Sequence, residues 1–405
     1  MFHGHRSLAL TLLFVVACNH GCAVVTPTYD AGDAGDAGDA ATSGDGCAAC
    51  LMPDAETLAD ARAADAAPEA GPGVAPGFVL SAYKDTSIAM NWNTNVIGTA
   101  VPGKATPLVA DLNAQKTKAI TLAFATGECG TETWGNLNGG LLASANVSAL
   151  AAANLGYTVS TGGAGGAFTC ASDAGFAAFL ARWSSKTLLG VDFDIEGGQT
   201  QAGIDELAKR TLAAHAARPA LRFSFTLAVR AGNDGSATAH SLGAAAPEPF
   251  NTHGMYAMSS VKSVLGFTGS PATWPAYVTV NLMVMDYGGP AASVCVVSNG
   301  VCDMGQSALQ AAYNVRDKYG VPMSAIELTP MLGGNDVQSE KFRLEDVDTL
   351  AAFAMSNPIA GLHFWSFDRD VDCPAGPASA TCNSMGNGYA GPHGYLARFA
   401  SHGLH

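Results

Sequence analysis

The sequence predicts an α/β fold, a (β/α)8 TIM barrel preceded by a signal peptide and a disordered linker. Apolar segments of strand length alternate with segments of helical periodicity, which is typical of parallel βαβ units. Glycines and acidic residues gather where several of these strands end, and a barrel of this type has its functional site at the carboxyl ends of its strands. The predicted strands span residues 87–93, 119–125, 157–160, 188–195, 221–227, 277–285, 325–331 and 359–367.

The predicted helices follow the same alternation. Ser172 is expected to cap a helix whose apolar residues recur at the spacing of one helical face. Further helices are expected over residues 201–216, 307–319 and 346–355, with Gly320 ending the second of these.

The amino-terminal segment is typical of an exported protein. An apolar run from Leu8 to Ala17 follows Arg6, and this run is too short for a transmembrane helix. We therefore expect residues 1–17 to be a signal peptide and the protein to be exported.

The end of this apolar run is similar to a bacterial lipobox. In Val15-Val16-Ala17-Cys18 the cysteine would become the lipidated amino terminus of a cell-surface or outer-membrane lipoprotein. Plain secretion, with cleavage near Ala23, is the alternative.

Residues 18–76 form a low-complexity segment. An Asp-Ala-Gly repeat runs from Asp30 to Asp39 and is followed by scattered Ala, Asp, Glu and Pro. The segment has no periodic apolar face to bury, so we expect a solvated, self-repelling tether. The barrel is expected to occupy residues 77–405.

The composition limits the possible partners. Hydrophobic residues make up 48% of the 405-residue chain, charged residues only 13%, and the formal net charge is −14. Much of this charge lies in residues 24–78, but the remaining body is also acidic. An acidic body argues against nucleic acid as a partner, because phosphate binding needs basic patches. We expect a monomer.

Ten cysteines are present, and export permits disulfide bonds. Two pairs are close enough in sequence to close a loop each, and a third would join the loops after two neighbouring strands, although connectivity cannot be established from sequence. These pairs are Cys295 with Cys302, Cys373 with Cys382, and Cys129 with Cys170. For Cys47 and Cys50 we favour a local disulfide or no role over a metal site, since no second metal-binding pair accompanies them.

Apolar and acidic residues alternate along the fourth predicted strand. Side chains alternate between the two faces of a strand, so three carboxyls would line one face and three apolar residues the other. The acidic set is Asp192, Asp194 and Glu196, and the apolar set is Val191, Phe193 and Ile195. If the acidic face is enclosed, its carboxyls cannot all be ionised, and at least one pKa should be raised.

Three interpretations of this acidic row are possible. It could be the solvated face of an edge strand, a calcium or magnesium site, or a set of carboxyls for acid catalysis on a glycosidic bond. Phe193 and Ile195 favour a strand that is buried on both faces, which weakens the first interpretation.

The segment Asp192-Phe193-Asp194-Ile195-Glu196 resembles the D-x-D-x-E core of glycoside hydrolase family 18, the chitinases. The fuller family signature is D-G-x-D-x-D-x-E. Gly190 occupies the place of its glycine, and Leu189 stands where its first aspartate usually lies. The other motifs extend the resemblance over roughly residues 79–400.

Two further strand ends resemble the family. Ser160-Thr161-Gly162-Gly163 is similar to its S-x-G-G motif, where small residues let the backbone approach the acidic strand and the serine can hydrogen-bond the first carboxyl. Met283-Val284-Met285-Asp286 is similar to its M-x-Y-D motif, with Met285 in the place of the tyrosine that binds the substrate acetamido group. A thioether cannot donate such a bond, so we expect Tyr287 to supply it. Barrel packing is the alternative role for Met283.

Aromatic residues are the remaining candidates for sugar contacts. Trp365 matches the tryptophan that forms the floor under the reacting sugar in the family, and aromatic faces suit the apolar faces of pyranose rings. Trp92, Trp134 and Trp274 could line a sugar-binding cleft or belong to the core.

The resemblance implies a retaining, substrate-assisted glycosidase that cleaves chitin or chitooligosaccharides without metal or cofactor. Glu196 would be the general acid, Asp194 would orient the acetamido group, Asp192 would share a proton with Asp194, and Asp286 would support the intermediate. A neutral sugar polymer is compatible with an acidic body. The alternatives are an endo-β-N-acetylglucosaminidase acting on N-glycans and a barrel that binds chitin without cleaving it.

Overall fold

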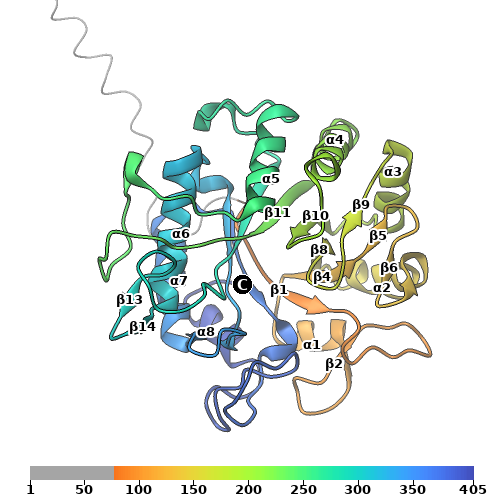
Figure 1. The fold of residues 1–405 in the computed structure, drawn as a ribbon. Coiled ribbons are helices and arrows are strands. Elements are labelled where there is room, and N and C mark those ends of the chain that lie inside the picture. The colour runs from red at the N-terminus through yellow and green to blue at the C-terminus, as the bar shows by residue number, and fades with distance from the viewer. Residues whose placement is uncertain (1–76) are drawn as a thin grey trace, which may run out of the picture. The chain divides into compact units, whose positions relative to one another are not determined.

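The computed structural model describes residues 77–405, so the expected signal peptide, Cys18 and the tether lie outside the described residues. Parallel strands close into an eight-stranded barrel in the order β1-β18-β15-β12-β11-β10-β8-β4, which confirms the predicted (β/α)8 fold (Figure 1). The barrel strands are β1 (Val79–Asp85), β4 (Ala119–Ala125), β8 (Gly156–Gly162), β10 (Leu188–Ile195), β11 (Arg222–Ala228), β12 (Val278–Met283), β15 (Ile326–Thr329) and β18 (Gly361–Trp365).

The prediction for the first strand is wrong. Residues 87–93 belong to the loop that follows β1, and the strand itself is Val79–Asp85. Lys84 obscures β1 in the sequence, because a lysine is rarely fully buried. In the structure its ammonium group is buried and forms an ion pair of 2.9 Å with Asp368. The other predicted strands overlap observed ones, and the bounds of β4 and β10 agree.

Helices surround the barrel (Figure 1). They are α1 (Leu108–Ala114), α2 (Gly139–Ala152), α3 (Asp173–Arg182), α4 (Gln201–Ala217), α5 (Thr252–Ser263), α6 (Met304–Tyr319), α7 (Leu344–Ser356) and α8 (Gly394–Ser401). As predicted, the Ser172 hydroxyl caps α3 by accepting the Gly175 N–H at 3.1 Å, and Gly320 ends α6 in the left-handed conformation (φ 76°). Among residues 77–405, no helix combines the length and the apolar character that a membrane crossing needs.

Short strands pair in the loops outside the barrel. They are β2 (Gly98–Thr99), β3 (Thr106–Pro107), β5 (Gly127–Glu128), β6 (Thr133–Trp134), β7 (Leu137–Asn138), β9 (Phe168–Thr169), β13 (Val297–Ser298), β14 (Val301–Cys302), β16 (Gly333–Gly334) and β17 (Lys341–Phe342). Disulfide bonds hold several of these loops, and all three pairings expected within the described residues are present. One of them, Cys129–Cys170, joins the loops after the neighbouring strands β4 and β8.

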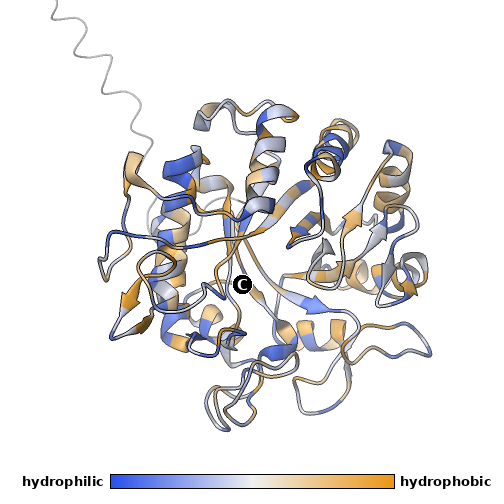
Figure 2. Ribbon diagram, in the orientation of Figure 1, coloured by the Kyte–Doolittle hydropathy of each residue, from blue (hydrophilic) through white to orange (hydrophobic). Residues whose placement is uncertain are grey.

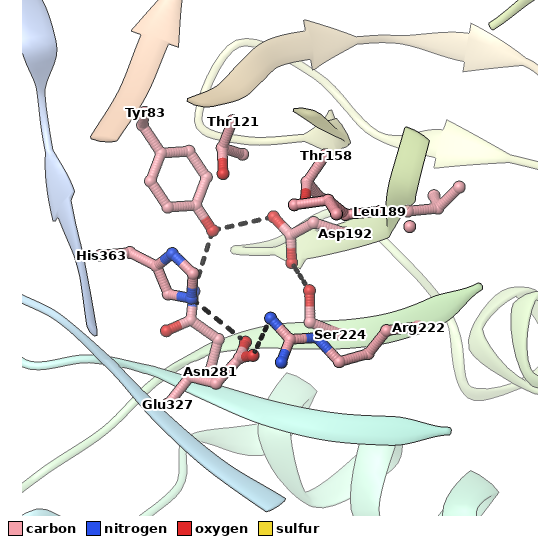
Figure 3. A pocket seen from close by; sticks show the side chains of 12 residues that line it. Tyr83, Thr121, Thr158, Leu189, Asp192, Arg222, Ser224, Asn281, Glu327 and His363 are labelled. Carbon is pink, nitrogen blue, oxygen red and sulfur yellow. Dashed lines mark hydrogen bonds and ion pairs between the residues drawn. The ribbon is translucent and has the colours of Figure 1, made fainter. Parts of the chain in front are cut away.

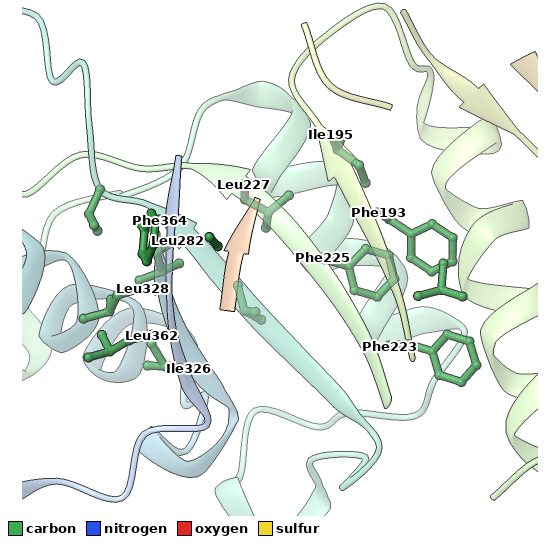
Figure 4. Close-up of a cluster of buried hydrophobic side chains, with 14 of the residues drawn as sticks. Phe193, Ile195, Phe223, Phe225, Leu227, Leu282, Ile326, Leu328, Leu362 and Phe364 are labelled. Carbon is green, nitrogen blue, oxygen red and sulfur yellow. The ribbon is translucent and has the colours of Figure 1, made fainter. Parts of the chain in front are cut away.

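The apolar core lies between the strands and the helices. The apolar residues of β10 point outwards, and the Phe193 ring lies 6.1 Å from that of Phe176 in α3 and 5.4 Å from that of Phe225 in β11 (Figure 4). The helices accordingly carry both hydrophobic and hydrophilic residues (Figure 2). The strand is therefore buried on both faces, as the alternation of its residues indicated.

The interior of the barrel is polar, whereas bulky apolar residues usually fill such barrels. The Ser81 hydroxyl lies 2.8 Å from that of Thr121 and 2.7 Å from His363 Nδ1, and Arg222 forms an ion pair of 2.8 Å with Glu327. Thr121, His363, Arg222 and Glu327 line a small cavity of about 10 Å³, and Asp192 lines it as well (Figure 3).

Gly190 is needed where β10 enters this layer. A Cβ atom at this position would lie 1.9 Å from the Arg222 carbonyl oxygen of β11. The strand that carries the acidic row can therefore pack closely on its neighbour only with glycine here.

The buried Glu327 predicts a pH-dependent part of the stability. Burial by itself raises the pKa of Glu327, but the charges of Arg222 and His363 outweigh it and lower the pKa from 4.5 to about 2. A depressed pKa in the folded state stabilises the protein above the unfolded value, and this contribution disappears as the pH falls towards 2. We expect Glu327→Gln to lower the free energy of unfolding at neutral pH by about 3 kcal/mol.

Urea denaturation at about pH 7 and about pH 3 tests this expectation, because the variant should lose less stability between the two than the wild type. Glu345→Gln, at an exposed carboxyl in α7, is the matched control. An equal pH dependence in wild type and Glu327→Gln would contradict the expectation.

Candidate active site

The carboxyl ends of the barrel strands surround a cavity of about 460 Å³ that is open to solvent. Side chains from β1, β4, β10, β11, β12, β15 and β18, together with residues of loops that follow the barrel strands, form its wall. Of the residues predicted for the site, the wall contains Asp194, Glu196, Met283, Met285, Asp286 and Trp365. The sequence motifs therefore do converge on one cavity, as the barrel topology requires.

Asp192 lies beneath this cavity and is held by four hydroxyl groups. Its side chain is 1% exposed and sits between Ser160 of β8 and Ser224 of β11, which are its neighbours in the strand register. Oδ2 accepts hydrogen bonds from the Tyr83 hydroxyl (2.9 Å) and Ser160 Oγ (2.6 Å), and Oδ1 accepts from Ser224 Oγ and Thr226 Oγ1 (both 2.6 Å). Burial raises the pKa of Asp192, and the four hydroxyls oppose that rise. The carboxylate is thus desolvated but fully hydrogen-bonded, which suits an anion.

Asp194 has the opposite environment. It is 5% exposed, and its Oδ1 has no hydrogen-bond partner among the described residues. Burial raises the pKa of Asp194 well above its usual value, and the negative charges of Glu196 and Asp192 raise it further. Because nothing compensates the charge of its anion, Asp194 retains its proton more readily than Asp192.

Glu196 follows the last residue of β10 and is exposed at the cavity wall. Partial desolvation at the cavity wall raises the pKa of Glu196. A backbone hydrogen bond from Ala164 lowers this pKa, and the negative charges of Asp286 and Asp336 raise it. A carboxyl with a raised pKa that reaches an open cavity can deliver a proton to a bound molecule near neutral pH.

Asp286 faces Glu196 from the loop after β12. It adopts a left-handed conformation (φ 51°), and its Oδ1 accepts the Val337 N–H at 2.8 Å. Burial raises the pKa of Asp286, the Val337 N–H lowers it, and Arg369 also lowers it. A backbone amide therefore orients this carboxyl towards the cavity.

Tyr287 does not line the cavity, so the expectation that it contacts a ligand there is not supported. Its side chain is 4% exposed and belongs to the apolar core, while its backbone N–H donates to Glu340 at 2.9 Å. The expectation assumed that the strand continues to Tyr287, so that Met285 and Tyr287 share a face. In fact β12 ends at Met283, and the left-handed Asp286 turns the chain.

Ser160 is likewise not at the cavity surface, since it is fully buried beside Asp192. Its predicted hydrogen bond to the first carboxyl of the row is confirmed. A direct contact between Ser160 and a ligand is not supported.

The glycines after Ser160 act as the sequence indicated. Gly162 has φ 89°, and a Cβ atom there would lie 2.1 Å from the Asp194 carbonyl oxygen. Only glycine allows β8 to approach the acidic strand this closely.

Trp365 forms the floor of the cavity together with other aromatic rings. Its ring stacks on Phe124 with centroids 5.4 Å apart, and Tyr83 lies 6.2 Å away. Flat aromatic surfaces of this kind bind the apolar face of a ring-shaped ligand.

The other three candidate tryptophans do not line the cavity. Trp134 is buried against Trp183 at 5.0 Å, Trp274 is buried against Phe267 at 4.9 Å, and Trp92 is 56% exposed. The core interpretation is therefore correct for Trp134 and Trp274.

Sequence reasoning missed several residues of the wall. Tyr83 and Asp85 lie at the end of β1, so correct recognition of that strand would have placed them at the site. Asp336 and the segment 378–380 lie in irregular loops and Arg369 ends a short 3-10 helix after β18, and no pattern in the sequence signals their position.

The four hydroxyl groups that bond Asp192, here called the hydroxyl cradle, can be tested without a ligand. They belong to Tyr83, Ser160, Ser224 and Thr226. Tyr83→Phe removes one of the four donors, so the anion is less stabilised and we expect the pKa of Asp192 to rise. Carbon-13 NMR of the aspartate carboxyl groups over a pH series measures this change. The control Tyr319→Phe removes a phenol that hydrogen-bonds Glu248 and not Asp192, so Asp192 should titrate as in the wild type. An unchanged or lower pKa of Asp192 in Tyr83→Phe would argue against the cradle.

The fold was compared with those of solved structures. The catalytic domain of a hyperthermophilic chitinase from Pyrococcus furiosus is similar with 23% sequence identity and a TM-score of 0.57, over 83% of this chain and 97% of that chain. A set of catalytic-site mutants of active domain 2 of the thermostable chitinase from the same organism, complexed with chito-oligosaccharides, has the same identity, TM-score and coverage. No family model and no curated protein sequence matches. The likeness shows that this chain has the barrel fold of chitinase catalytic domains.

Proposed function

We propose that the protein is a chitinase-like glycoside hydrolase of the family 18 type, which cleaves β-1,4 links between N-acetylglucosamine units with retention of configuration. The observation that carries the proposal is the order of three carboxyls along the inward face of β10 and at its end. Asp192 is buried and fully bonded, Asp194 is buried with an unpartnered oxygen, and Glu196 reaches the open cavity. The fold shared with chitinase catalytic domains supports it.

Glu196 is proposed as the general acid that protonates the glycosidic oxygen, because it combines a raised pKa with access to the cavity. The 2-acetamido oxygen of the substrate then attacks the anomeric carbon, so no protein nucleophile is needed. Water opens the resulting intermediate with Glu196 acting as base. Asp286 supports the acetamido group or the intermediate from the opposite wall.

Asp194 is proposed to orient the acetamido group. Met285 has no proton to donate, and Tyr287 lies outside the cavity, so neither supplies the hydrogen bond that a tyrosine would provide. A protonated Asp194 is a donor at the right depth, and its raised pKa favours the protonated form. Asp192, beneath it, is proposed to share that proton as the reaction proceeds.

The sugar ring is proposed to lie on Trp365 and Phe124, with Met283 and Met285 at its edge. The mechanism calls for no metal, because the proton and the nucleophile come from Glu196 and the substrate. Export with a lipid on Cys18 remains a proposal from the sequence pattern. The three disulfide bonds of the barrel are compatible with an oxidising compartment.

Removal of the proposed acid is the first test of the activity. We expect the wild type to release products from chitin oligosaccharides and Glu196→Gln to lose on the order of 10³-fold or more in kcat, because the amide cannot deliver a proton. Product analysis by chromatography measures cleavage, and calorimetry measures oligosaccharide binding. The exposed Glu345→Gln is the matched control.

Two other results would redirect the proposal. Binding without cleavage by both the wild type and Glu196→Gln would mean a non-catalytic chitin-binding barrel. Neither binding nor cleavage would exclude chitin as the ligand and make N-glycans the next substrates to examine.

The pH dependence supplies a second test. A general acid must be protonated, so activity should fall as the pH rises through the pKa of Glu196, which lies above its usual 4.5. Asp336→Asn removes a like charge that raises this pKa, so we expect the alkaline limb of the kcat/KM profile to move to lower pH. If the alkaline limb of the profile stays in place or moves to higher pH, Glu196 is not the general acid whose pKa the charge of Asp336 raises.

A further inference from the structure

One wall of the cavity consists of a short loop with no charged or aromatic side chain directed at the ligand space. Ala378, Ser379 and Ala380 line the same cavity as Glu196 and Trp365. A volume of about 460 Å³ lies in the range of sites that bury drug-sized molecules, so it is larger than a single sugar ring requires. The cavity therefore has room for more than one sugar ring, and the loop forms part of its wall.

This loop is held rigidly at its ends. The disulfide Cys373–Cys382 closes it, and the following residue, Asn383, donates its N–H to the Val371 carbonyl at 2.9 Å. The Asn383 carbonyl in turn accepts the Gly334 N–H at 2.9 Å. The loop after β18 is thus joined through its backbone to the loop after β15.

Arg369 makes the second connection between these loops. Its side chain is 1% exposed, and its guanidinium donates to the carbonyls of Leu332 (Nη2, 2.8 Å) and Gly334 (Nη2, 2.5 Å), and through Nη1 to that of Ser379. The first two carbonyls belong to the loop after β15, and the third belongs to the cavity wall itself. A planar fork of donors is needed to reach all three at once, and lysine does not have one.

The loop after β15 also supports the proposed catalytic machinery. Val337, three residues after Gly334, donates the backbone N–H that orients Asp286. Arg369 itself lines the cavity, but its Nε, Nη1 and Nη2 atoms all donate hydrogen bonds to backbone carbonyl groups. Its position therefore couples the wall at 378–380 to the segment that orients Asp286.

We propose that the disulfide-closed loop 373–382 is the wall of a binding subsite for a sugar unit adjoining the reacting one, and that Arg369 is the positioning residue that fixes this wall. The inference rests on the proposed function and extends it to longer oligomers. A β-1,4-linked N-acetylglucosamine oligomer would place one of its neighbouring rings against the small side chains of Ala378 and Ala380. Small residues suit this place, because a larger side chain would occupy the space of the ring.

The test compares a long and a short substrate within each variant. We measure kcat/KM for the hexamer and the trimer of N-acetylglucosamine and take their ratio. Ala378→Trp fills the subsite, so we expect this ratio to fall by about 10-fold or more, equivalent to the loss of at least about 1.4 kcal/mol of transition-state stabilisation for the hexamer relative to the trimer. Ala375→Trp is the matched control: it makes the same substitution in the same loop at an exposed residue that does not line the cavity, and it should leave the ratio unchanged.

Arg369 is tested with the same substrates. In Arg369→Lys and Arg369→Met we expect the KM for the hexamer to rise more than the KM for the trimer, with the larger effect in Arg369→Met, since lysine keeps a charge and part of the hydrogen bonding. A purely structural role would change both substrates equally. Thermal unfolding of each variant identifies any that fail to fold, and Ala378→Trp decides the matter independently of them.

The outcomes separate the inference from the proposed function. If the wild type cleaves the oligomers but Ala378→Trp has the same hexamer-to-trimer ratio as Ala375→Trp, the subsite is wrong and the hydrolase remains. If the wild type cleaves neither oligomer, the proposed function fails, and the subsite fails with it.

Discussion

The burial of Asp192 inside a protein barrel is the constraint on which the site depends. A carboxylate without water is costly unless hydrogen bonds replace the lost solvation. Tyr83, Ser160, Ser224 and Thr226 supply these bonds from three strands, β1, β8 and β11, and the last two are the neighbours of β10 in the barrel. The polar interior of this barrel is therefore not an anomaly of packing but the surroundings that a buried acid needs.

The same constraint explains why the carboxyls of β10 differ so much. Asp192 and Asp194 lie on the inward face of the strand and Glu196 directly follows its end, yet hydroxyl groups bond only the deepest carboxyl. Asp194 is one step nearer the cavity and has no partner for Oδ1, while Glu196 has left the strand and meets solvent. Identical chemistry along one face thus becomes a graded series, in which depth decides which carboxyl holds a proton.

The outward face of β10 supplies the apolar packing that the polar inward face lacks. Phe193 and its aromatic neighbours fill the layer between strands and helices, so apolar burial on the outside compensates for a polar inside. Beneath Asp192, the ion pair of Arg222 and Glu327 continues the polar layer towards the other end of the barrel. The loops after β12, β15 and β18 form part of the wall of the cavity above Asp192.

Long-range pairing set the limits of prediction from the sequence. The alternation along β4 and β10 and the caps of α3 and α6 could be read directly, because side-chain period and turn chemistry are local. Local patterns failed at β1, where Lys84 is neutralised by Asp368, a residue far along the chain. They failed again at Tyr287, where the left-handed conformation of Asp286 ends the assumed periodicity.

The sequence by itself determined the fold class, the alternation of acidic and apolar residues along β10, and the convergence of Asp286 and Trp365 on the carboxyl ends of the strands. Each of these follows from a short segment combined with the general rule that barrel strands end at one rim. Only the tertiary structure decided which hydroxyls hold Asp192, that Asp194 stands without a partner, and that Arg369 fastens the 378–380 wall. These contacts join residues far apart in the chain, and their geometry exists only once the barrel has closed.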